Sequence, residues 1–138
     1  MNDPVFSTVL AGVLIFVLGQ FVQNFILKPI QDFRVVLTMI SHKVKFWANV
    51  ITNSGLPPDM VSQARADMRD LSSNLESRYI VIPFKKILVY VGAIPSVEDV
   101  RIAGKKLIFL YNSGGEGRSV VQNSEAINEL KKKLKLEL

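Results

Sequence analysis

Few side chains in this chain could do chemistry, and the single histidine is the first to consider. His42 lies between Ile40 and Val44, two apolar residues that recur at helical spacing. Imidazole is the side chain whose ordinary pKa lies nearest neutrality, so an acid–base site would be built around it. The acidic residues are scattered, however, and none forms a pair bracketed by apolar sequence. We therefore place His42 on a packed or wet helix flank and expect no enzymatic activity.

Cofactor and nucleic-acid chemistry are equally poorly represented. The chain has no cysteine, which excludes disulfides, thiolate metal sites and thiol nucleophiles. The glycine-rich segment NSGGEG at 112–117 lacks the Gly-Lys-Ser/Thr ending of a phosphate-binding loop, and no predicted strand precedes it. The net charge of +5 is spread along predicted helices instead of clustering on a recognition element. We expect no cofactor, no metal and no nucleic-acid partner.

The remaining chemistry belongs to amides inside an apolar run from Val5 to Leu27. This run carries no charge, and 15 of its 23 residues are Val, Ile, Leu or Phe. As a helix it would be about 34 Å long, enough to cross a hydrocarbon core of about 30 Å. A buried helix of a water-soluble protein is one alternative. A cleaved signal peptide is another, but no basic region precedes the run and no small-residue cleavage site follows it.

The small and polar residues of this predicted span gather on one side of the helix. At about 100° per residue, a narrow face with two flanking amides is formed by Thr8, Gly12, Gly19, Gln20, Gln23 and Asn24. Small residues let helix backbones approach, and amides form hydrogen bonds across helices in lipid. The face predicts self-association into a homo-oligomer. Alternatively, the amides meet water near the headgroups, or they line a pore.

Flanking charges predict the orientation of the span. Asp3 precedes it, whereas the basic residues Lys28, Arg34, Lys43 and Lys45 follow. Because cytoplasmic flanks carry the excess of Lys and Arg, the N-terminus is expected outside the cell. The predicted domains are a transmembrane anchor at 1–28 and a cytoplasmic helical domain at 29–138.

After the span, apolar residues recur at alternating steps of three and four, which is a heptad pattern. This helical seam consists of Ile30, Phe33, Leu37, Ile40, Val44, Trp47 and Ile51, followed by Val61, Met68, Leu71 and Leu75. It predicts helices at 29–52 and 58–79 that form a hairpin over residues 29–82. An intramolecular hairpin and an intermolecular coiled coil would use the same heptads, so both remain open. The other faces carry charges of both signs and are expected to be solvated.

The hairpin leads back to the membrane surface, where the apolar segment 83–95 follows. With Lys28, the predicted lipid-surface contacts are Phe84, Lys85, Lys86, Ile87 and Leu88, and Tyr79 and Tyr90 are expected at the boundary. A core segment buried beneath the hairpin is the alternative.

Residues 96–138 predict two further amphipathic helices. Ser96 is a suitable N-cap for the first of them. The second ends in ELKKKLKLEL, a lysine run that is either a solvated helix face or a contact for anionic lipid. The predicted fold is all-α, with one N-terminal transmembrane helix that continues into the helical hairpin and these two helices.

A resemblance to a known group is carried by four segments: FILKPIQDFR, WANVITNSG, MRDLSSNLESRYIVIPF and GAIPSVEDVRIAGKKLIFLYNSG. In this order they resemble a group of small bacterial single-span membrane proteins without an assigned activity. The similarity covers most of residues 5–115, and the chain departs from the group after Ser113. The resemblance implies a bacterial plasma (inner) membrane, and it carries over no functional residues.

Three functions remain as hypotheses. The favoured one is a membrane-anchored, self-associating helical scaffold or regulatory subunit whose partners are lipid, copies of itself and a protein in the cytoplasm or membrane. The second is an oligomeric effector of growth arrest or phage defence that permeabilises the bilayer. The third is a small-ligand sensor that relays a signal to the span.

Overall fold

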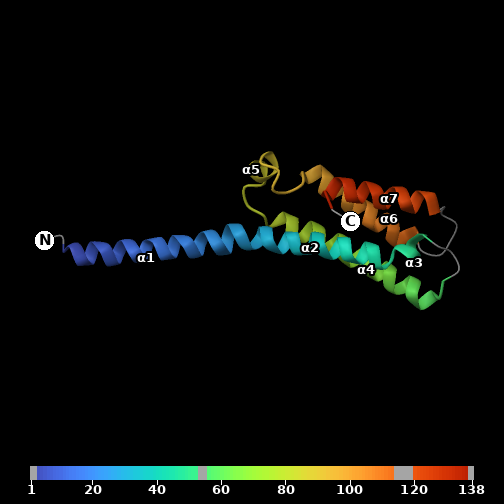
Figure 1. The fold of residues 1–138 in the computed structure, drawn as a ribbon, viewed down its shortest axis with the longest axis horizontal. Helices are drawn as coiled ribbons and strands as arrows, with labels where there is room; N and C mark the ends of the chain where they lie inside the picture. Colours follow the sequence, from blue (N-terminus) through green and yellow to red (C-terminus); the bar gives the residue numbers. More distant parts are fainter. Residues whose placement is uncertain (1–2, 53–55, 114–119, 137–138) are drawn as a thin grey trace.

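The computed structural model describes residues 3–52, 56–113 and 120–136, and the elements in these ranges are all helical. In chain order they are α1 (Pro4–Val22), a π-helical turn (Gln23–Leu27), α2 (Lys28–Phe46), α3 (Ala48–Thr52), α4 (Pro58–Ile80), α5 (Lys85–Tyr90), α6 (Val97–Ser113) and α7 (Val120–Leu134). Figure 1 shows α1 as a bare stem that projects from a bundle of the other helices. The expectation of an all-helical chain with a long apolar N-terminal helix is confirmed. The glycine-rich segment considered above extends into residues outside the described ranges.

The stem and the first helix of the bundle form one continuous helix from Pro4 to Phe46, 43 residues long. At 1.5 Å per residue it measures about 64 Å. Pro29 does not interrupt it, because the π turn directly before it widens the helix. Lys28 N–H donates to the Gln23 carbonyl, five residues back, and the wider turn makes room for the proline ring.

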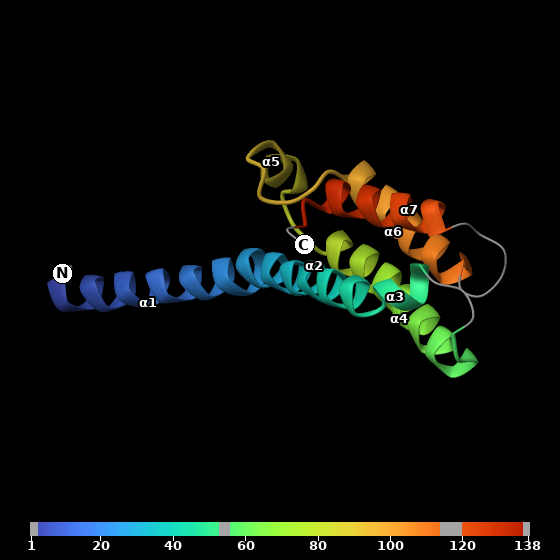
Figure 2. The same ribbon diagram turned by 45° about the vertical axis from the view of Figure 1, so that its right-hand side comes forward.

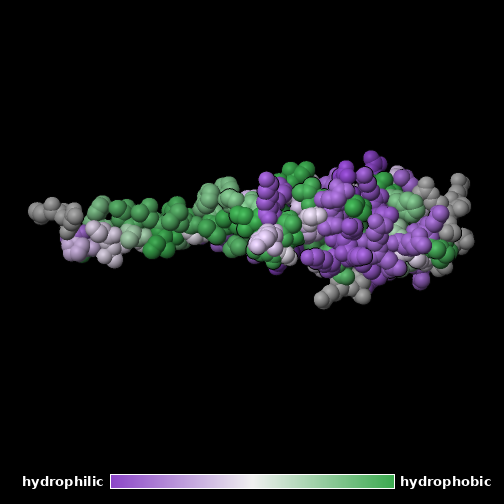
Figure 3. All heavy atoms as spheres, turned by 90° about the horizontal axis from the view of Figure 1, so that it is seen from above, coloured by the Kyte–Doolittle hydropathy of each residue, from purple (hydrophilic) through white to green (hydrophobic). Residues whose placement is uncertain are grey.

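Burial divides this helix where the π turn lies. Every residue from Asp3 to Phe25 is exposed, and burial begins with the half-buried side chains of Ile26, Pro29 and Ile30. Figure 3 shows the stem as a mostly hydrophobic surface and the bundle as a largely hydrophilic one. The stem therefore has no packing partner within the described part of the chain.

Helices α2 and α4 run antiparallel, as two ion pairs between them show. Near the stem, Arg78 Nη1 lies 3.5 Å from Asp32 Oδ2, and further along α2 Lys43 Nζ lies 2.9 Å from Asp67 Oδ2. The aromatic rings of Phe33 and Tyr79 also meet, 5.4 Å apart. Early residues of α2 thus face late residues of α4.

Helix α6 packs along α4 in the most extensive helix contact of the bundle. Gly104 lies at the crossing, where a Cβ atom would stand 2.7 Å from Glu76 Oε1, the tip of an exposed side chain that can turn aside. At the same crossing, Ser72 Oγ donates to the Gly104 carbonyl at 3.1 Å.

Helix α7 returns antiparallel to α6, with ion pairs between Lys106 and Glu129 and between Asp99 and Lys133. It is also joined to α3, because Asn123 Nδ2 donates to the Ile51 carbonyl at 2.6 Å.

The core lies between α2, α4, α6 and α7, and the seam residues contribute to it within a single chain. Phe33, Ile40, Val44, Trp47, Ile51, Met68, Leu71 and Leu75 are buried, and Ile30, Leu37 and Val61 are half-buried against them. The helix predicted over 29–52 is divided, however, because α2 ends at Phe46 and α3 begins at Ala48. Trp47 stands between them with φ −92° and ψ 5°, and its indole N–H reaches Asp67 on α4 at 2.6 Å.

The segment 83–95 forms a turn of chain around the short helix α5. Figures 1 and 2 place it at the end of the bundle from which the stem projects. The prediction for Tyr79 at the membrane boundary is wrong. Tyr79 is buried, and its hydroxyl donates to the Pro95 carbonyl at 2.9 Å, which holds this turn against α4.

Candidate functional site

The small and amide side chains of the span lie on a helix surface that nothing in the described chain covers. Gly12 and Gly19 have open space where a side chain would stand, since a Cβ atom added at either position would have no neighbour within 4 Å. Thr8 Oγ1 donates to the Pro4 carbonyl at 2.8 Å, so its hydroxyl is satisfied within the helix. Gln20, Gln23 and Asn24 are exposed. The structure thus leaves this face free for another helix.

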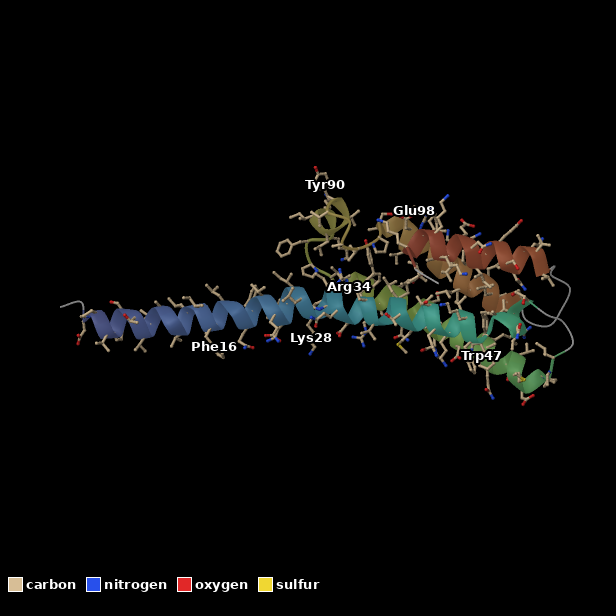
Figure 4. The ribbon with its side chains drawn as sticks, in the orientation of Figure 1. Phe16, Lys28, Arg34, Trp47, Tyr90 and Glu98 are labelled. Carbon is tan, nitrogen blue, oxygen red and sulfur yellow. The ribbon has the colours of Figure 1, made fainter. Side chains whose placement is uncertain are left out.

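The turn around α5 exposes apolar side chains at the stem end of the bundle. Phe84, Ile87 and Val91 are largely exposed, and Tyr90 is 91% exposed and points away from the bundle in Figure 4. Leu88 contacts the core from the other side of α5. One side of the turn therefore anchors it to the domain, and the other is an apolar surface without a partner among the described residues.

The lysines predicted to contact lipid occupy different environments. Lys28 and Lys86 are exposed beside the stem and on α5. Lys85 is half-buried, because its ammonium donates to the Ile80 carbonyl at 2.7 Å and lies 5.8 Å from the centre of the Tyr79 ring. It therefore caps the C-terminal end of α4, where a cation is favourable.

A second apolar stripe, on the outer face of α2, is formed by Val35, Met39, His42 and Phe46. A groove of about 270 Å³ lies along the stripe and is lined by the first three of these residues. His42 stacks on Phe46 with ring centres 6.3 Å apart, so the histidine lies on a wet helix flank. Sequence reasoning missed the stripe because its steps of four, three and four run parallel to the stronger seam.

The Asp67 carboxylate holds two side chains of the neighbouring segment at once. Lys43 Nζ and Trp47 Nε1 both donate to its Oδ2 atom, at 2.9 and 2.6 Å. Burial opposes the ionisation of Asp67, but these hydrogen bonds outweigh it and lower its pKa. The arrangement joins α2 to α4 and offers no reactive group.

A groove of about 580 Å³ lies between α4 and α6 and is lined by basic and hydroxyl side chains. Its walls are Ser62, Arg65, Ala66, Arg69, Asp70 and Ser73 from α4 and Tyr111 from α6. Sequence reasoning took the α4 residues for a solvated surface. Their spacing of three and four places them on one face, but no pattern in α4 indicates that Tyr111 closes the groove.

The lysine run near the C-terminus is partly engaged within the bundle. Lys133 Nζ lies 3.0 Å from Asp99 Oδ1, while Lys132 is exposed. The side chain of Asp99 also accepts a hydrogen bond from Ser96, and both contacts lower its pKa. Ser96 Oγ in turn accepts from Asp99 N–H at 3.1 Å, which is the N-cap contact expected from the sequence. Across the described residues, no His, Asp and Glu cluster suited to a metal ion is found.

A comparison of the chain with protein families, with curated proteins and with solved structures finds no match. In the absence of a match, the class of protein is described by its fold. It is an all-helical protein with one N-terminal helix that is long and apolar enough to cross a membrane.

Proposed function

We propose that the protein is a membrane-anchored, self-associating helical scaffold that holds its bundle against the inner face of a bacterial plasma membrane. The stem crosses the bilayer with its N-terminus outside, and residues 29–138 lie in the cytoplasm. The scaffold has no catalytic role. Its activity is to concentrate copies of the bundle, and the protein partner that they recruit, on a lipid surface.

The observation that carries this proposal is the continuous helix from Pro4 to Phe46 with two unlike halves. The first half is apolar and has no buried residue, whereas the second supplies core residues such as Phe33 and Ile40. A core helix of a water-soluble protein would be mostly buried along its apolar stretch, and this stretch is not. Lipid is the environment that an exposed, uncharged helix of this length requires.

Self-association is supported by the alignment of two uncovered surfaces on the long helix, the small and amide face of the stem and the apolar stripe on α2. At about 100° per residue, and with one residue inserted by the π turn, the outer stripe of α2 continues the side that carries Gln20 and Gln23. Two parallel copies could then touch through amides and small residues in lipid, and through Val35, Met39 and Phe46 outside it. Interhelical contacts of this kind contribute about 0.6–2 kcal/mol each in membranes.

The turn around α5 supports docking of the bundle on the bilayer. Its apolar side chains lie beside the point where the stem leaves the bundle, and Lys28 and Lys86 are exposed nearby. Aromatic and apolar side chains next to lysines are typical of segments that lie in the interface of a membrane.

The test uses the absence of cysteine from the chain. A Thr8→Cys variant places one thiol on the span face, and oxidative crosslinking in native membranes then measures self-association. Adding Gly12→Leu and Gly19→Leu should lower crosslinking about three- to thirtyfold, since bulky side chains separate the helices. An added Cβ atom meets no neighbour within 4 Å at either position, and both positions lie outside the bundle core, so the bundle should keep its fold.

The matched control is Ser7→Leu, which adds bulk about 140° around the helix from Gly12. Its crosslinking should equal that of the parent. Equal losses in all variants, or none, would contradict association through this face. Recovery of the untagged chain without detergent among dissolved proteins would contradict the anchor itself. Leakage of dye from liposomes would favour the permeabilising effector over the scaffold.

A further inference from the structure

The groove between α4 and α6 carries more basic than acidic side chains. Two guanidinium groups line it, those of Arg65 and Arg69, against the single carboxylate of Asp70. The ring of Tyr111 forms the opposite wall, and the Arg69 guanidinium lies 6.0 Å from its centre. The hydroxyls of Ser62 and Ser73 add neutral hydrogen-bonding groups at the same face.

Neither arginine has an ion-pair partner among the described residues. The ion pairs found there mostly join one helix to another, and none of them includes Arg65 or Arg69. Arg65 is half-buried, and its Nε–H is shielded from the surface, so a ligand in the groove is met by the terminal Nη groups of the guanidinium. The planar fork of arginine suits the oxygens of a carboxylate or a phosphate.

The position of the groove separates its ligand from the membrane. Arg69 and Arg65 precede Ile80 by 11 and 15 residues on α4, so they lie about 16 and 22 Å along the helix from the stem end of the bundle. A lipid headgroup in the bilayer that holds the stem does not reach that far. The ligand therefore comes from solution.

We propose that this groove binds a small organic phosphate, with Arg65 and Arg69 holding the phosphate group and Tyr111 contacting the organic part. Two neighbouring guanidinium groups match the two charges of a phosphate better than the one charge of a carboxylate. The groove is open on its outer side, and its volume of about 580 Å³ leaves room for an organic part beside the phosphate group. The remaining carboxylate oxygen of Asp70 selects a ligand that offers a donor, since Oδ2 already accepts from Asn74 at 2.9 Å.

The groove belongs to the bundle, so ligand binding there does not depend on self-association of the span, and only the conclusion that the ligand comes from solution rests on the proposed membrane anchor. Because α4 contacts both α2 and α6, a ligand between α4 and α6 is placed to alter how α4 packs on the helix that continues into the membrane.

The test is calorimetric titration of the full chain in zwitterionic phosphatidylcholine nanodiscs, with adenosine monophosphate, inorganic phosphate and succinate as probes. Adenosine monophosphate should bind, and Arg69→Gln should weaken it about ten- to a hundredfold through loss of a charged hydrogen bond. Arg65→Gln should weaken binding to a similar degree. Arg65→Lys should weaken it less, because lysine keeps the positive charge and the packed aliphatic part of the side chain. Asp70→Asn should bind more tightly because it removes a repelling charge.

The control is Arg101→Gln, which removes the same charge from α6 at an exposed position paired with Glu98. It should bind as the parent does. The proposal is overturned if the parent binds no phosphate probe at millimolar concentration, or if Arg101→Gln weakens binding as much as Arg69→Gln. Tighter binding of succinate than of both phosphates would overturn the assignment of the ligand class. Unchanged melting temperatures would show that the variants remain folded.

Discussion

The two halves of the long helix have the same backbone and opposite surroundings. Phe16 in α1 is 66% exposed, whereas Phe33 in α2 is fully buried, although both lie on one continuous helix. The difference comes from the residues around them. Nothing charged lies between Pro4 and Leu27, and apolar side chains occupy every side of α1 except the narrow face of small and amide residues, while charged residues confine the buried side chains of α2 to a stripe.

If the stem crosses a membrane as proposed, one helix serves two solvents because its residue pattern changes along its length. Uniform apolarity suits lipid, which surrounds a helix on all sides, and a stripe suits a protein core, which lies on one side. Because no loop separates the halves, a tilt or rotation of the stem displaces the buried residues of α2. The π turn at Gln23–Leu27 is the place where the two patterns meet.

The largest effect is expected when the same change is made in both halves. Phe33→Ala should lower the free energy of unfolding of the bundle by about 3–5 kcal/mol, since it leaves a cavity in the core. Phe16→Ala should leave that free energy unchanged. Denaturant titration of the detergent-solubilised chain measures both, because the single tryptophan, Trp47, is buried and reports the bundle. Comparable losses in the two variants would mean that the stem also packs on protein.

The reverse experiment adds a charge to an exposed residue in each half. Leu14→Arg should disfavour membrane insertion by about 2.5–3.5 kcal/mol, whereas Val35→Arg should leave it unchanged. Extraction of membranes with alkaline carbonate measures how much of each variant stays integrated. Equal extraction of both would mean that the boundary between lipid and water is not at the π turn.

Much of this arrangement could be predicted from the sequence, because it depends on residues close together in the chain. The steps of three and four that end at Leu75 mark which side of each helix turns inward, and the structure buries or half-buries those residues. Ser96 likewise begins a helix through a contact with Asp99, three residues away. The long apolar helix at the N-terminus could be predicted from the length of the uncharged run alone.

The remainder depends on partners that are distant in sequence. Trp47 ends α2 because Asp67 accepts its N–H from another helix, and Tyr79 turns inward because the Pro95 carbonyl accepts its hydroxyl. Neither contact has a local signature. The groove at Arg69 is a similar case, since Tyr111 reaches it from α6. A heptad pattern marks a buried face but does not say which helix covers it.

Low pH should affect the two halves of the long helix differently, because it destabilises the bundle and leaves the stem unchanged. The pKa of Asp67 is lowered in the folded bundle, so its contribution to stability is fully present above its ordinary pKa of 3.8 and is lost as the pH falls through the folded value. Asp67→Asn should cost about 1–2 kcal/mol at neutral pH and flatten this acid limb. Trp47 fluorescence measures the bundle, and flotation on a density gradient measures the anchor.

The anchor should remain in the membrane throughout, since no side chain between Pro4 and Leu27 titrates in this range. Release of the chain from vesicles at the pH at which Trp47 becomes exposed would show that the bundle, not the stem, holds it there. If the stability of the bundle falls with pH in the same way in Asp67→Asn and in the parent, Asp67 is not the group that causes the loss.

The smallest effect is expected at the turn around α5. This turn exposes apolar side chains, as the stem does, but it also contacts the core of the bundle. Val91 on this turn and Val121 at the start of α7 are 64% and 63% exposed, so Val→Ser is a matched change at the two sites. Val91→Ser should weaken docking of the bundle on a bilayer by at most about 1 kcal/mol, because part of one side chain returns to water. Val121→Ser should not affect docking.

Docking can be measured with a polarity-sensitive dye on Lys86→Cys, the one thiol in an otherwise cysteine-free chain. In vesicles the emission of the Val91→Ser variant should shift toward that of the dye in water, and Val121→Ser should retain the parent spectrum. Both variants should keep the parent's free energy of unfolding, since neither side chain lies in the core. If both spectra equal the parent's, the exposed apolar side of α5 faces a protein partner instead of lipid, and only the stem contacts the membrane.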